Sequence, residues 1–527
     1  METTSVIVLG GSLVGLSAAM FLASRGVSTI LVERHPGSSP HPRALGYTPR
    51  TMELFRSVGL SIPEAPADFR LRRARVESLA GKWFEESTWN PDQDGKAKIQ
   101  HSAYRGAAIA QDKLEPKLRE KAIELGADIR LETELIDFQQ DDNGVTVRVR
   151  CRDEEEYEIR AKYLLAADGH RSKIREMLGI GRTGRGVLRA VRSVLFRAPL
   201  DEYLEAGVVQ FSIDQAQLQA FLTFYLDGRW MLMLYDDEER DAATLTSLIR
   251  RAIGRADIPI EILGAGRWEL AALIADSFSS GRVFLAGDAA HCLPPTRGGY
   301  GANTGIEDVH NLAWKFAAVL SGASSPELLA TYDAERRPIA WLRHDQIFAR
   351  PDYKAHAGNF GEGVSIIDDD AMEFGQLYRS NAVIGTTTAL PAALRPEQWA
   401  GQPGTRAPYA PLEDRSTLDL CQGGWVVLAS EDAWRDAAAT ASKLLGLDVQ
   451  FQAIAPEVHT LFGIGRSGAT VIRPDGYIGC RSDDMPLDAS QLLTHAIAHM
   501  SSAPSNQSPI PSGGLAVRDL DAREPQG

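Results

Sequence analysis

The sequence has 527 residues and a mass of 57.4 kDa, with 56 basic and 70 acidic side chains and a formal net charge of −14. Its 44% hydrophobic and 24% charged residues are typical of a globular protein of two or three domains, which excludes disordered, fibrous and small disulfide-rich proteins. The acidic balance argues against a nucleic-acid partner, because binding a polyanion needs a basic surface.

The N-terminal residues predict a strand, a helix and a second strand. The run at 5–9 is β-branched, the apolar spacing over 13–25 is helical, and the run at 27–32 is again typical of a strand. The apolar stretch Leu13 to Ala23 is too short to cross a bilayer and follows no basic signal-peptide region. We therefore expect a cytoplasmic protein that makes no membrane contact.

A glycine-rich turn joins the first strand to the helix. Gly10 to Gly15 follow the pattern G-x-G-x-x-G, except that Ser12 replaces the second glycine. Such a turn lets the backbone approach a pyrophosphate and aims the helix N–H groups at the phosphates. Glu33 closes the second strand 18 positions after Gly15, where an acidic group accepts the hydroxyls of an adenosine ribose. This context favours a dinucleotide site over a simple strand–helix turn.

Hairpins dominate the middle of the chain. Asn143-Gly144 lies between two strand-like runs, and a strand at 163–166 leads into Asp168-Gly169. The runs 221–226 and 229–234 are joined by Asp227-Gly228, which predicts a two-residue turn and a β-rich module inserted into the first.

The last third of the chain predicts a helix and a separate small module. Apolar residues share one face of a helix over 305–320. After a Pro/Gly-rich stretch near 390–411, the chain up to about 500 has an α/β pattern, and 501–527 has the composition of a disordered tail.

Two further segments place a carboxylate at the end of a strand. They are Asp168-Gly169 and Gly287-Asp288, and each carboxylate can reach a sugar hydroxyl of a bound cofactor. Either aspartate alone could be a helix cap. Their combination with the glycine turn favours a nucleotide cofactor.

These three motifs resemble those of the FAD-dependent aromatic hydroxylases with the para-hydroxybenzoate hydroxylase fold. The stretch 294–305 is similar to the flavin-contacting segment of that family. Residues 32–37 and 41–53 resemble the polyketide hydroxylases of the aklavinone and tetracenomycin type, and 469–477 resemble the thioredoxin-like domain of the phenol hydroxylase branch.

The resemblance implies an α/β fold: a Rossmann-like FAD-binding domain, an inserted β-sheet substrate domain and a thioredoxin-like C-terminal domain. The cysteines are widely spaced and form no CxxC or zinc pattern, so we expect reduced thiols, no metal site and a structural or dimer-forming C-terminal domain. The cysteines are Cys151, Cys292, Cys421 and Cys480. The expected boundaries are 1–180 (FAD, with an excursion into the substrate domain near 76–105), 181–278 (substrate), 279–390 (FAD and helical linker), 391–500 (thioredoxin-like) and 501–527 (tail).

The resemblance also assigns roles to individual residues. Gln111 would contact the flavin side chain and Arg43 would lie beside flavin and nicotinamide; their alternative roles are a helix N-terminal polar residue and a surface arginine. Leu135 would meet the adenine through its backbone or be a plain strand residue. The implied cofactor-binding residues are Gly10, Ser12, Leu13, Gly15, Glu33, Arg34, Arg43, Gln111, Leu135, Asp168, Asp288, Gly301, Ala302 and Asn303.

The implied reaction is hydroxylation of a polycyclic phenol through a flavin C4a-hydroperoxide, with NADPH or NADH and molecular oxygen as co-substrates. Arg43 and Pro294 are the catalytic candidates, and Tyr104, Tyr225 and Trp230 are candidates for the substrate pocket. The sequence identifies no catalytic base; the histidines considered are His41, His101 and His291.

Several alternatives stay open. A Baeyer–Villiger or ring-cleaving oxygenase on the same fold differs only in its product. A non-catalytic flavin-binding subunit would bind FAD without responding to aromatics, and a plain NAD-dependent dehydrogenase would bind no flavin. The sequence is compatible with a monomer or a homodimer.

Overall fold

The computed structural model describes residues 1–64, 72–88, 99–204, 207–295, 300–350, 353, 364–412 and 415–504. The chain forms two compact units. Unit 1 contains residues 1–313 and 337–369, and unit 2 contains 314–336 with the described residues from 370 onward. Most of the predicted tail, 505–527, lies outside the described residues.

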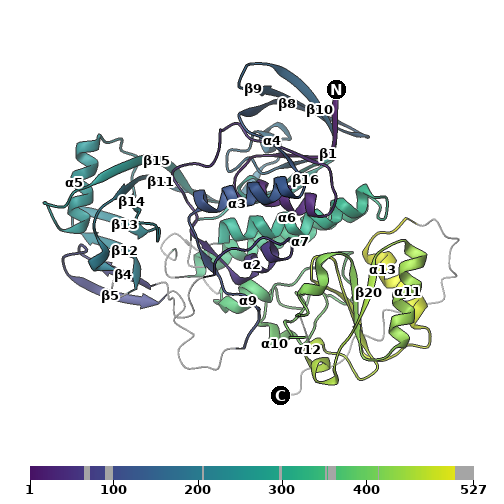
Figure 1. The fold of residues 1–527 in the computed structure, drawn as a ribbon. Helices are drawn as coiled ribbons and strands as arrows, with labels where there is room; N and C mark the ends of the chain where they lie inside the picture. The colour runs from purple at the N-terminus through teal and green to yellow at the C-terminus, as the bar shows by residue number, and fades with distance from the viewer. Residues whose placement is uncertain are drawn as a thin grey trace. The chain divides into compact units, whose positions relative to one another are not determined.

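The first sheet of unit 1 contains the predicted strand–helix–strand unit, which is confirmed. β1 (Glu2–Leu9) and β2 (Thr29–Val32) pair in parallel, and α1 (Leu13–Ser24) connects them. β1 lies beside β10 in the sheet order β16-β17-β10-β1-β2-β7, to which β8 and β9 add the predicted hairpin (Figure 1). Its turn is Asp142-Asn143, one residue earlier than the predicted Asn143-Gly144, because Asp141 pairs with Gly144. The remaining strands are β7 (Asp128–Arg130), β8 (Thr133–Asp141), β9 (Gly144–Cys151), β10 (Glu156–Ala166), β16 (Ser279–Ser280) and β17 (Val283–Leu285).

Four strands of this sheet end at the same edge. Leu9 of β1 pairs with Val32 of β2 and with Ala166 of β10, and Ala166 pairs with Leu285 of β17. All these pairings are parallel. The glycine turn, Glu33 and both aspartate motifs therefore leave the sheet together at its carboxyl edge, which is where open α/β sheets bind ligands.

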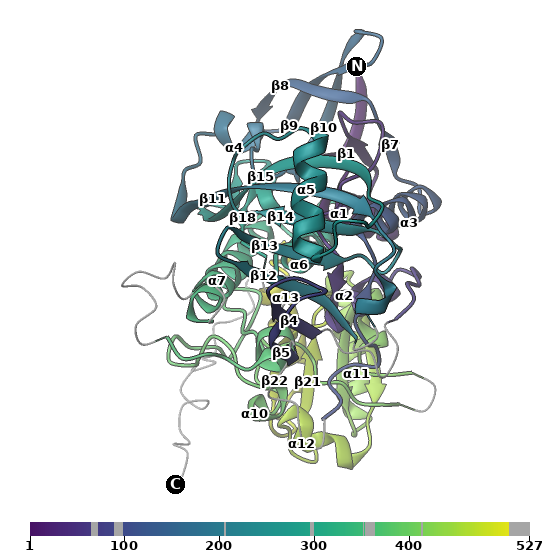
Figure 2. The same cartoon turned by 90° about the vertical axis from the view of Figure 1, so that its left-hand side faces the viewer.

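The second sheet of unit 1 has the order β18-β15-β11-β14-β13-β12-β4-β5. It is antiparallel except where β12 meets β4. Helix α5 covers the face that points away from the first sheet (Figure 1, Figure 2). The strands are β4 (Arg72–Val76), β5 (Trp83–Thr88), β11 (Arg182–Arg197), β12 (Val208–Gln215), β13 (Leu218–Phe224), β14 (Trp230–Leu234), β15 (Glu261–Ala275) and β18 (His291–Cys292).

The hairpin between β13 and β14 is confirmed, but its turn is longer than predicted. Phe224 pairs with Trp230, and the N–H of Tyr225 donates to the carbonyl of Arg229. The loop therefore holds Leu226, Asp227 and Gly228, of which Leu226 (φ +63°) and Gly228 (φ +81°) adopt left-handed conformations. The register consequently differs by one residue from that of a two-residue turn.

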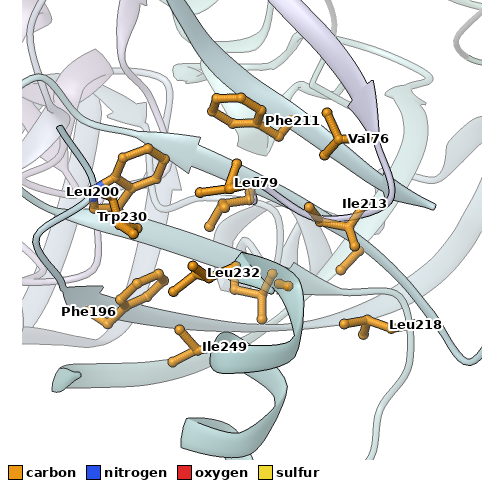
Figure 3. Close-up of a cluster of buried hydrophobic side chains, with 14 of the residues drawn as sticks. Val76, Leu79, Phe196, Leu200, Phe211, Ile213, Leu218, Trp230, Leu232 and Ile249 are labelled. Atoms are coloured by element: carbon orange, nitrogen blue, oxygen red, sulfur yellow. The ribbon is translucent and has the colours of Figure 1, made fainter. Parts of the chain in front are cut away.

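Alternate side chains of β14 are buried on opposite faces of the second sheet. Trp230, Leu232 and Leu234 belong to the core beneath α5, together with Ile249 of that helix (Figure 3). Met231 and Met233 belong to a separate apolar cluster on the other face. We call this second set the inner apolar cluster; its fully buried members are Ala110, Val191, Leu195, Tyr225, Met231, Met233 and Leu270.

Unit 2 contains a four-stranded sheet with the order β20-β19-β21-β22. β19 and β20 are parallel, and the other pairs are antiparallel. Helix α11 joins the first two strands and α13 follows the last, so the predicted thioredoxin-like topology is confirmed. The strands are β19 (Trp425–Ala429), β20 (Val449–Ala453), β21 (Ala469–Ile472) and β22 (Ile478–Ser482).

The helix predicted over 305–320 begins five residues earlier, at Tyr300. Within the described residues, no helix combines the length and apolarity needed to cross a membrane.

A short two-stranded sheet joins β3 (Gly46–Tyr47) to β6 (Ala107–Ala108). The helices are α2 (Pro49–Arg56), α3 (Gln111–Glu124), α4 (Lys173–Met177), α5 (Ala242–Ile253), α6 (Tyr300–Leu320), α7 (Glu327–Ala349), α9 (Asp369–Phe374), α10 (Pro396–Trp399), α11 (Ala433–Leu445), α12 (His459–Phe462) and α13 (Ala489–Met500).

Candidate functional site

The turn after β1 can be formed only by residues without side chains at two positions. Gly10 has φ +100°, and a Cβ on it would lie 2.3 Å from the carbonyl oxygen of Ala167. A Cβ on Gly15 would lie 1.8 Å from the carbonyl oxygen of Gly10. Ser12 is the N-cap of α1, and Leu13 is the buried first residue of the helix. The first-turn N–H groups of α1 therefore point toward the carboxyl edge of the sheet, as an anion site requires.

Glu33 ties the end of β2 to this turn. Its Oε2 accepts from the N–H of Gly11 (2.6 Å), and its Oε1 accepts from the N–H of His35 (2.8 Å). A carboxylate oxygen can accept more than one hydrogen bond, so Glu33 keeps capacity for sugar hydroxyls. Arg34 is exposed and donates to His35. The backbone of Thr133, at the start of β8, donates to the carbonyl of Glu33 (2.9 Å).

That last contact brings the start of β8 beside the end of β2. Leu135 stands two residues further along β8 and is half-buried, with Val149 of β9 opposite it. Its backbone therefore lies near the predicted ribose position. The predicted adenine contact of Leu135 stays a prediction.

A chain of polar side chains links α1 to α3. Ser12 Oγ donates to Glu115 Oε1 (2.7 Å), and Gln111 Nε2 donates to both Ser12 Oγ (3.0 Å) and Glu115 Oε1 (2.8 Å). Gln111 Oε1 accepts from the N–H groups of Arg43 and Ala44, both at 3.3 Å. The structure thus brings together Ser12, Gln111 and the backbone of Arg43. The buried Glu115 is a functional candidate that the sequence interpretation missed; its only signal is a carboxylate four residues after Gln111 on one helix face.

The two carboxylate oxygens of Asp168 have different surroundings. Its Oδ2 accepts from the N–H of Ile174 (3.4 Å), whereas its Oδ1 is buried and has no hydrogen-bond partner among the described residues. Burial raises the pKa of Asp168 above the ordinary value. An oxygen in this state is suited to accept a hydrogen bond from a ligand hydroxyl.

Asp288 lies near Arg43. It follows Gly287, which has φ +59°, in a short 3₁₀ turn after β17. Burial lowers the pKa of His170 and raises that of Cys292 to about 12, and the charges of Asp288 and Arg43 both act on these two side chains. The charges of Asp288 and Arg43 therefore both act on residues that directly follow the two aspartate motifs.

The first turn of α6 completes the edge. A Cβ on Gly305 would lie 2.5 Å from a Val14 methyl group and 2.9 Å from the Cα of Gly287, so α6, α1 and the Gly287 turn meet here. Gly301, Ala302 and Asn303 lie in this first helical turn. The side chain of Asn303 is structural: it accepts from Thr51 Oγ1 (2.6 Å) and donates to the carbonyl of Gly46 (3.3 Å). Only the backbone of Asn303 is therefore suited to the predicted flavin contact.

His291 is a structural residue. Its Nε2 lies 2.6 Å from Asp308 Oδ2, which also accepts from the N–H of Gly287 (3.2 Å), and both side chains are completely buried. This interaction fixes the Gly287 turn on α6. Arg175 has a similar role and was also missed from sequence, because its guanidinium donates to the carbonyls of Ala289 (2.9 Å) and His170 (3.2 Å). Pro294 is buried and has no polar side chain; its predicted catalytic role stays a prediction.

The substrate-pocket candidates are not brought together. Tyr225 lies in the inner apolar cluster, its hydroxyl donates to the carbonyl of Pro42 (2.7 Å), and burial raises its pKa. Trp230 is corrected to a core residue, because it packs on the opposite face against Phe211 and Phe224 (Figure 3). The longer turn shifts the register by one residue and so moves Trp230 to the face opposite Tyr225.

The other candidates have different surroundings. Tyr104 lies before β6, with the guanidinium of Arg56 5.7 Å from its ring centroid. His101 is buried, and His41 shares a hydrogen bond with Ser193. Among the described residues no cluster of three or more His, Cys, Asp or Glu side chains could hold a metal ion.

Comparison with protein families matches most of the chain. Residues 3–346 match the model described as "FAD binding domain", and residues 400–504 match "Aromatic-ring hydroxylase, C-terminal". The first match covers the carboxyl edge of the first sheet with all its motifs, and the second covers the thioredoxin-like sheet.

Individual relatives are similar over nearly their whole length. The chain is 38% identical to a 4-methyl-5-nitrocatechol 5-monooxygenase of Burkholderia sp. over 93% of this chain and 96% of the relative. It is 35% identical to a tetracenomycin B2 monooxygenase-dioxygenase of Streptomyces olivaceus over 94% and 98%. A solved structure of aklavinone-11 hydroxylase with FAD and aklavinone superposes with a TM-score of 0.86 at 35% identity, covering 95% of this chain and 99% of that one.

Proposed function

Because the chain belongs to the FAD-dependent aromatic-ring hydroxylases, we propose that it hydroxylates a polycyclic phenol of polyketide type with NADPH or NADH and molecular oxygen. The observation that carries the proposal is the carboxyl edge of the first sheet, where the glycine turn, Glu33, Asp168 and Asp288 converge. A step in polyketide antibiotic biosynthesis belongs to the same proposal, supported by the tetracenomycin and aklavinone relatives.

The residues present fit FAD. A dinucleotide needs a tight glycine turn between the strand and the helix, and Cβ atoms at Gly10 and Gly15 would collide with the backbone of Ala167 and of Gly10 and so open this turn. It also needs acceptors for its hydroxyls, and Asp168 Oδ1 is a buried acceptor without a protein partner while Glu33 keeps lone pairs available. We assign the pyrophosphate to the Gly10–Gly15 turn, the ribose to Glu33, and the flavin end to Gln111, Asp288 and the first turn of α6.

The protein's own contribution is orientation and exclusion of water. When bound, FAD supplies reduction by the nicotinamide nucleotide and activation of oxygen. The N-terminal end of α6 would favour negative charge on a flavin held at this edge. The inner apolar cluster on the second sheet offers an apolar face to an aromatic ring, which limits access of water during oxygen transfer.

The described residues offer no free general base in that cluster. The Tyr225 hydroxyl is a hydrogen-bond donor to Pro42, and burial keeps it protonated at neutral pH by raising its pKa. We therefore propose that the substrate ionises through its own acidic hydroxyl, as the phenols of fused aromatic polyketides can. The ring-cleaving alternative is supported by the tetracenomycin relative, whose name includes a dioxygenase activity.

The test is NADPH and NADH oxidation by the FAD-loaded protein against matched phenols of one, two, three and four rings. We expect consumption to rise most with three- and four-ring phenols, and mass spectrometry to find products with one added oxygen atom. A product with a cleaved ring would favour the alternative activity. Yellow protein whose consumption of NADPH and NADH is unchanged by every phenol would contradict the proposal and indicate a non-catalytic flavin protein.

A further inference from the structure

The segment His41–Leu45 lies between the two sheets of unit 1 and is held from both sides. At its centre is Arg43, whose side chain is exposed and whose charge acts on the pKa of His170 and Cys292, beside the aspartate motifs. Arg43 belongs to neither sheet; its backbone N–H donates to Gln111 Oε1 on α3, and its charge acts on His170 and Cys292.

The FAD-binding side holds the backbone of this segment. Gln111 Oε1 accepts from the N–H groups of Arg43 and Ala44, and the N–H of Gln111 donates to the carbonyl of Ala44 (2.9 Å). The N–H of Ile109 donates to the carbonyl of Leu45 (2.9 Å). These contacts fix the residues on the C-terminal side of Arg43.

The second sheet holds the residues on the N-terminal side of Arg43. His41 Nε2 and Ser193 Oγ share a hydrogen bond of 2.7 Å, and the imidazole ring lies over Gly266, where a Cβ would come within 3.4 Å of it. Ser193 and Gly266 are paired neighbours on β11 and β15, so the ring rests on one cross-strand pair. The Tyr225 hydroxyl adds a bond to the carbonyl of Pro42.

Ser193 belongs to the face of the sheet that carries the inner apolar cluster. Val191 and Leu195 lie two positions before and after it on β11, so the three side chains share one face of the sheet, and Ser193 pairs with Met233 of β14. It is itself buried. The strands that offer an apolar face to the substrate therefore also carry the hydroxyl that holds His41.

We infer that the His41–Ser193 hydrogen bond is a positioning contact, through which the substrate-binding sheet sets the place of Arg43 for the incoming nicotinamide nucleotide. The inference rests on the proposed use of NADPH or NADH and on the place beside the nicotinamide that the family resemblance implies for Arg43. The bond to Ser193 restrains the side chain of His41, two positions before Arg43, while Gln111 binds the backbone N–H groups of Arg43 and Ala44.

The first test measures the segment directly in the FAD-loaded protein. Ser193→Ala removes the hydroxyl, and Ser212→Ala on β12, three strands away in the same sheet, is the control, because no hydrogen bond of its side chain is found among the described residues. We expect Ser193→Ala to accelerate hydrogen exchange of the peptide covering His41–Leu45 by about twofold to tenfold, the effect of one lost hydrogen bond. Unchanged exchange in that peptide would overturn the inference.

The second test distinguishes positioning from general loosening. Oxidised holoenzyme is titrated with NADP⁺ and NAD⁺, followed by the flavin difference spectrum, for wild type, Ser193→Ala, Arg43→Ala and the double variant. We expect Ser193→Ala to weaken nucleotide binding about twofold to tenfold while FAD content stays the same, and to have less than about a twofold effect when Arg43 is already alanine. His41→Gln, which can still bond to Ser193, should retain most of the affinity.

An equal effect of Ser193→Ala with and without Arg43 would overturn the positioning role. If neither nucleotide binds the wild-type protein, the proposed use of NADPH or NADH falls, whereas the exchange experiment still decides whether Ser193 holds the Arg43 segment.

Discussion

Glu335 in unit 2 and Asp168 in unit 1 are two carboxylates with buried oxygens and opposite surroundings. Glu335 is completely buried and accepts from Lys315 Nζ (2.8 Å), from both terminal nitrogens of Arg473 (2.6 and 3.0 Å) and from Ser380 Oγ (2.7 Å). Asp475 pairs with the same arginine. Asp168, by contrast, has a buried oxygen, Oδ1, that has no hydrogen-bond partner among the described residues.

The pKa directions follow the same division. Burial alone would raise the pKa of Glu335, but the charges of Arg473 and Lys315 outweigh it and hold the pKa well below the usual range. Burial dominates at Asp168 and raises its pKa. A carboxylate surrounded by cations contributes to the fold, whereas a desolvated carboxylate with a vacant oxygen costs stability until a ligand hydroxyl reaches it.

Glu335→Gln tests the paired side of this comparison and should have the largest effect. It leaves the buried cations Lys315 and Arg473 opposite a single carboxylate, that of Asp475. We expect the free energy of unfolding to fall by about 3–5 kcal/mol, measured by urea denaturation with FAD absent. Glu457→Gln, at an exposed position, is the control and should change it by less than about 0.5 kcal/mol. A loss as small as that of the control would show that the cluster does not stabilise unit 2.

Gly10→Ala tests the backbone that carries Asp168. The new Cβ would lie 2.3 Å from the Ala167 carbonyl at a left-handed φ of +100°. Because the turn must move, we expect FAD affinity to fall about tenfold to a hundredfold, measured by titration of the apoprotein with FAD. Gly37→Ala, where a Cβ meets no atom within 4 Å, should leave the affinity unchanged. Tight FAD binding by Gly10→Ala would contradict the assigned pyrophosphate site.

Asp168→Asn tests the unpaired side and should act in opposite directions on apoprotein stability and on cofactor binding. The pKa of Asp168 is higher in the folded than in the unfolded state, so the folded state binds the proton more tightly. As the pH rises from the ordinary pKa through the raised one, Asp168 ionises and the free energy of unfolding of the wild type falls. We expect the variant apoprotein to melt about 1–3 °C higher than wild type at pH 7, with the difference disappearing near pH 4 and below. Its FAD affinity should decrease. A lower melting temperature at pH 7 would mean that the carboxylate is stabilising, like Glu335.

Cys480→Ala should have the smallest effect. Burial raises the pKa of this thiol to about 12, so its reactive thiolate is scarcer in the folded protein than in the unfolded chain. We expect maleimide labelling of Cys480 to be at least about tenfold slower in the native protein than in urea, and the variant to hydroxylate at the wild-type rate. Rapid native labelling with loss of activity would give the C-terminal domain a chemical role that its sheet does not suggest.

The sequence predicted the site where local motifs carry the information. A strand that ends in Gly-Asp or Asp-Gly is recognisable from a few consecutive residues. Asp168, Asp288 and the glycine turn were therefore predicted as site residues without any knowledge of which strands pair. The partners that hold them were missed because each is distant: Ser12 and Glu115 are 103 positions apart, and Arg175 and Ala289 are 114 apart. Nothing in a short window reveals such pairs.

The error at Trp230 has a more specific cause. Asp227-Gly228 predicts a two-residue turn, which would pair Tyr225 with Trp230 and place both on one face. The actual loop also includes Leu226 in a left-handed conformation, which a branched side chain rarely adopts and local propensity does not favour. Because side chains alternate along a strand, that one residue decides which aromatic faces the inner apolar cluster.

The alignment of Leu9, Ala166 and Leu285 has a consequence for how the protein acquires its cofactor during synthesis. The glycine turn leaves the ribosome first, but the edge that holds both aspartates exists only after β17 has paired beside β10. The whole of the second sheet except its short edge strand β18 is translated before that pairing. Incorporation of FAD at this edge therefore requires that β17 has paired with β10, which follows translation of the inserted module.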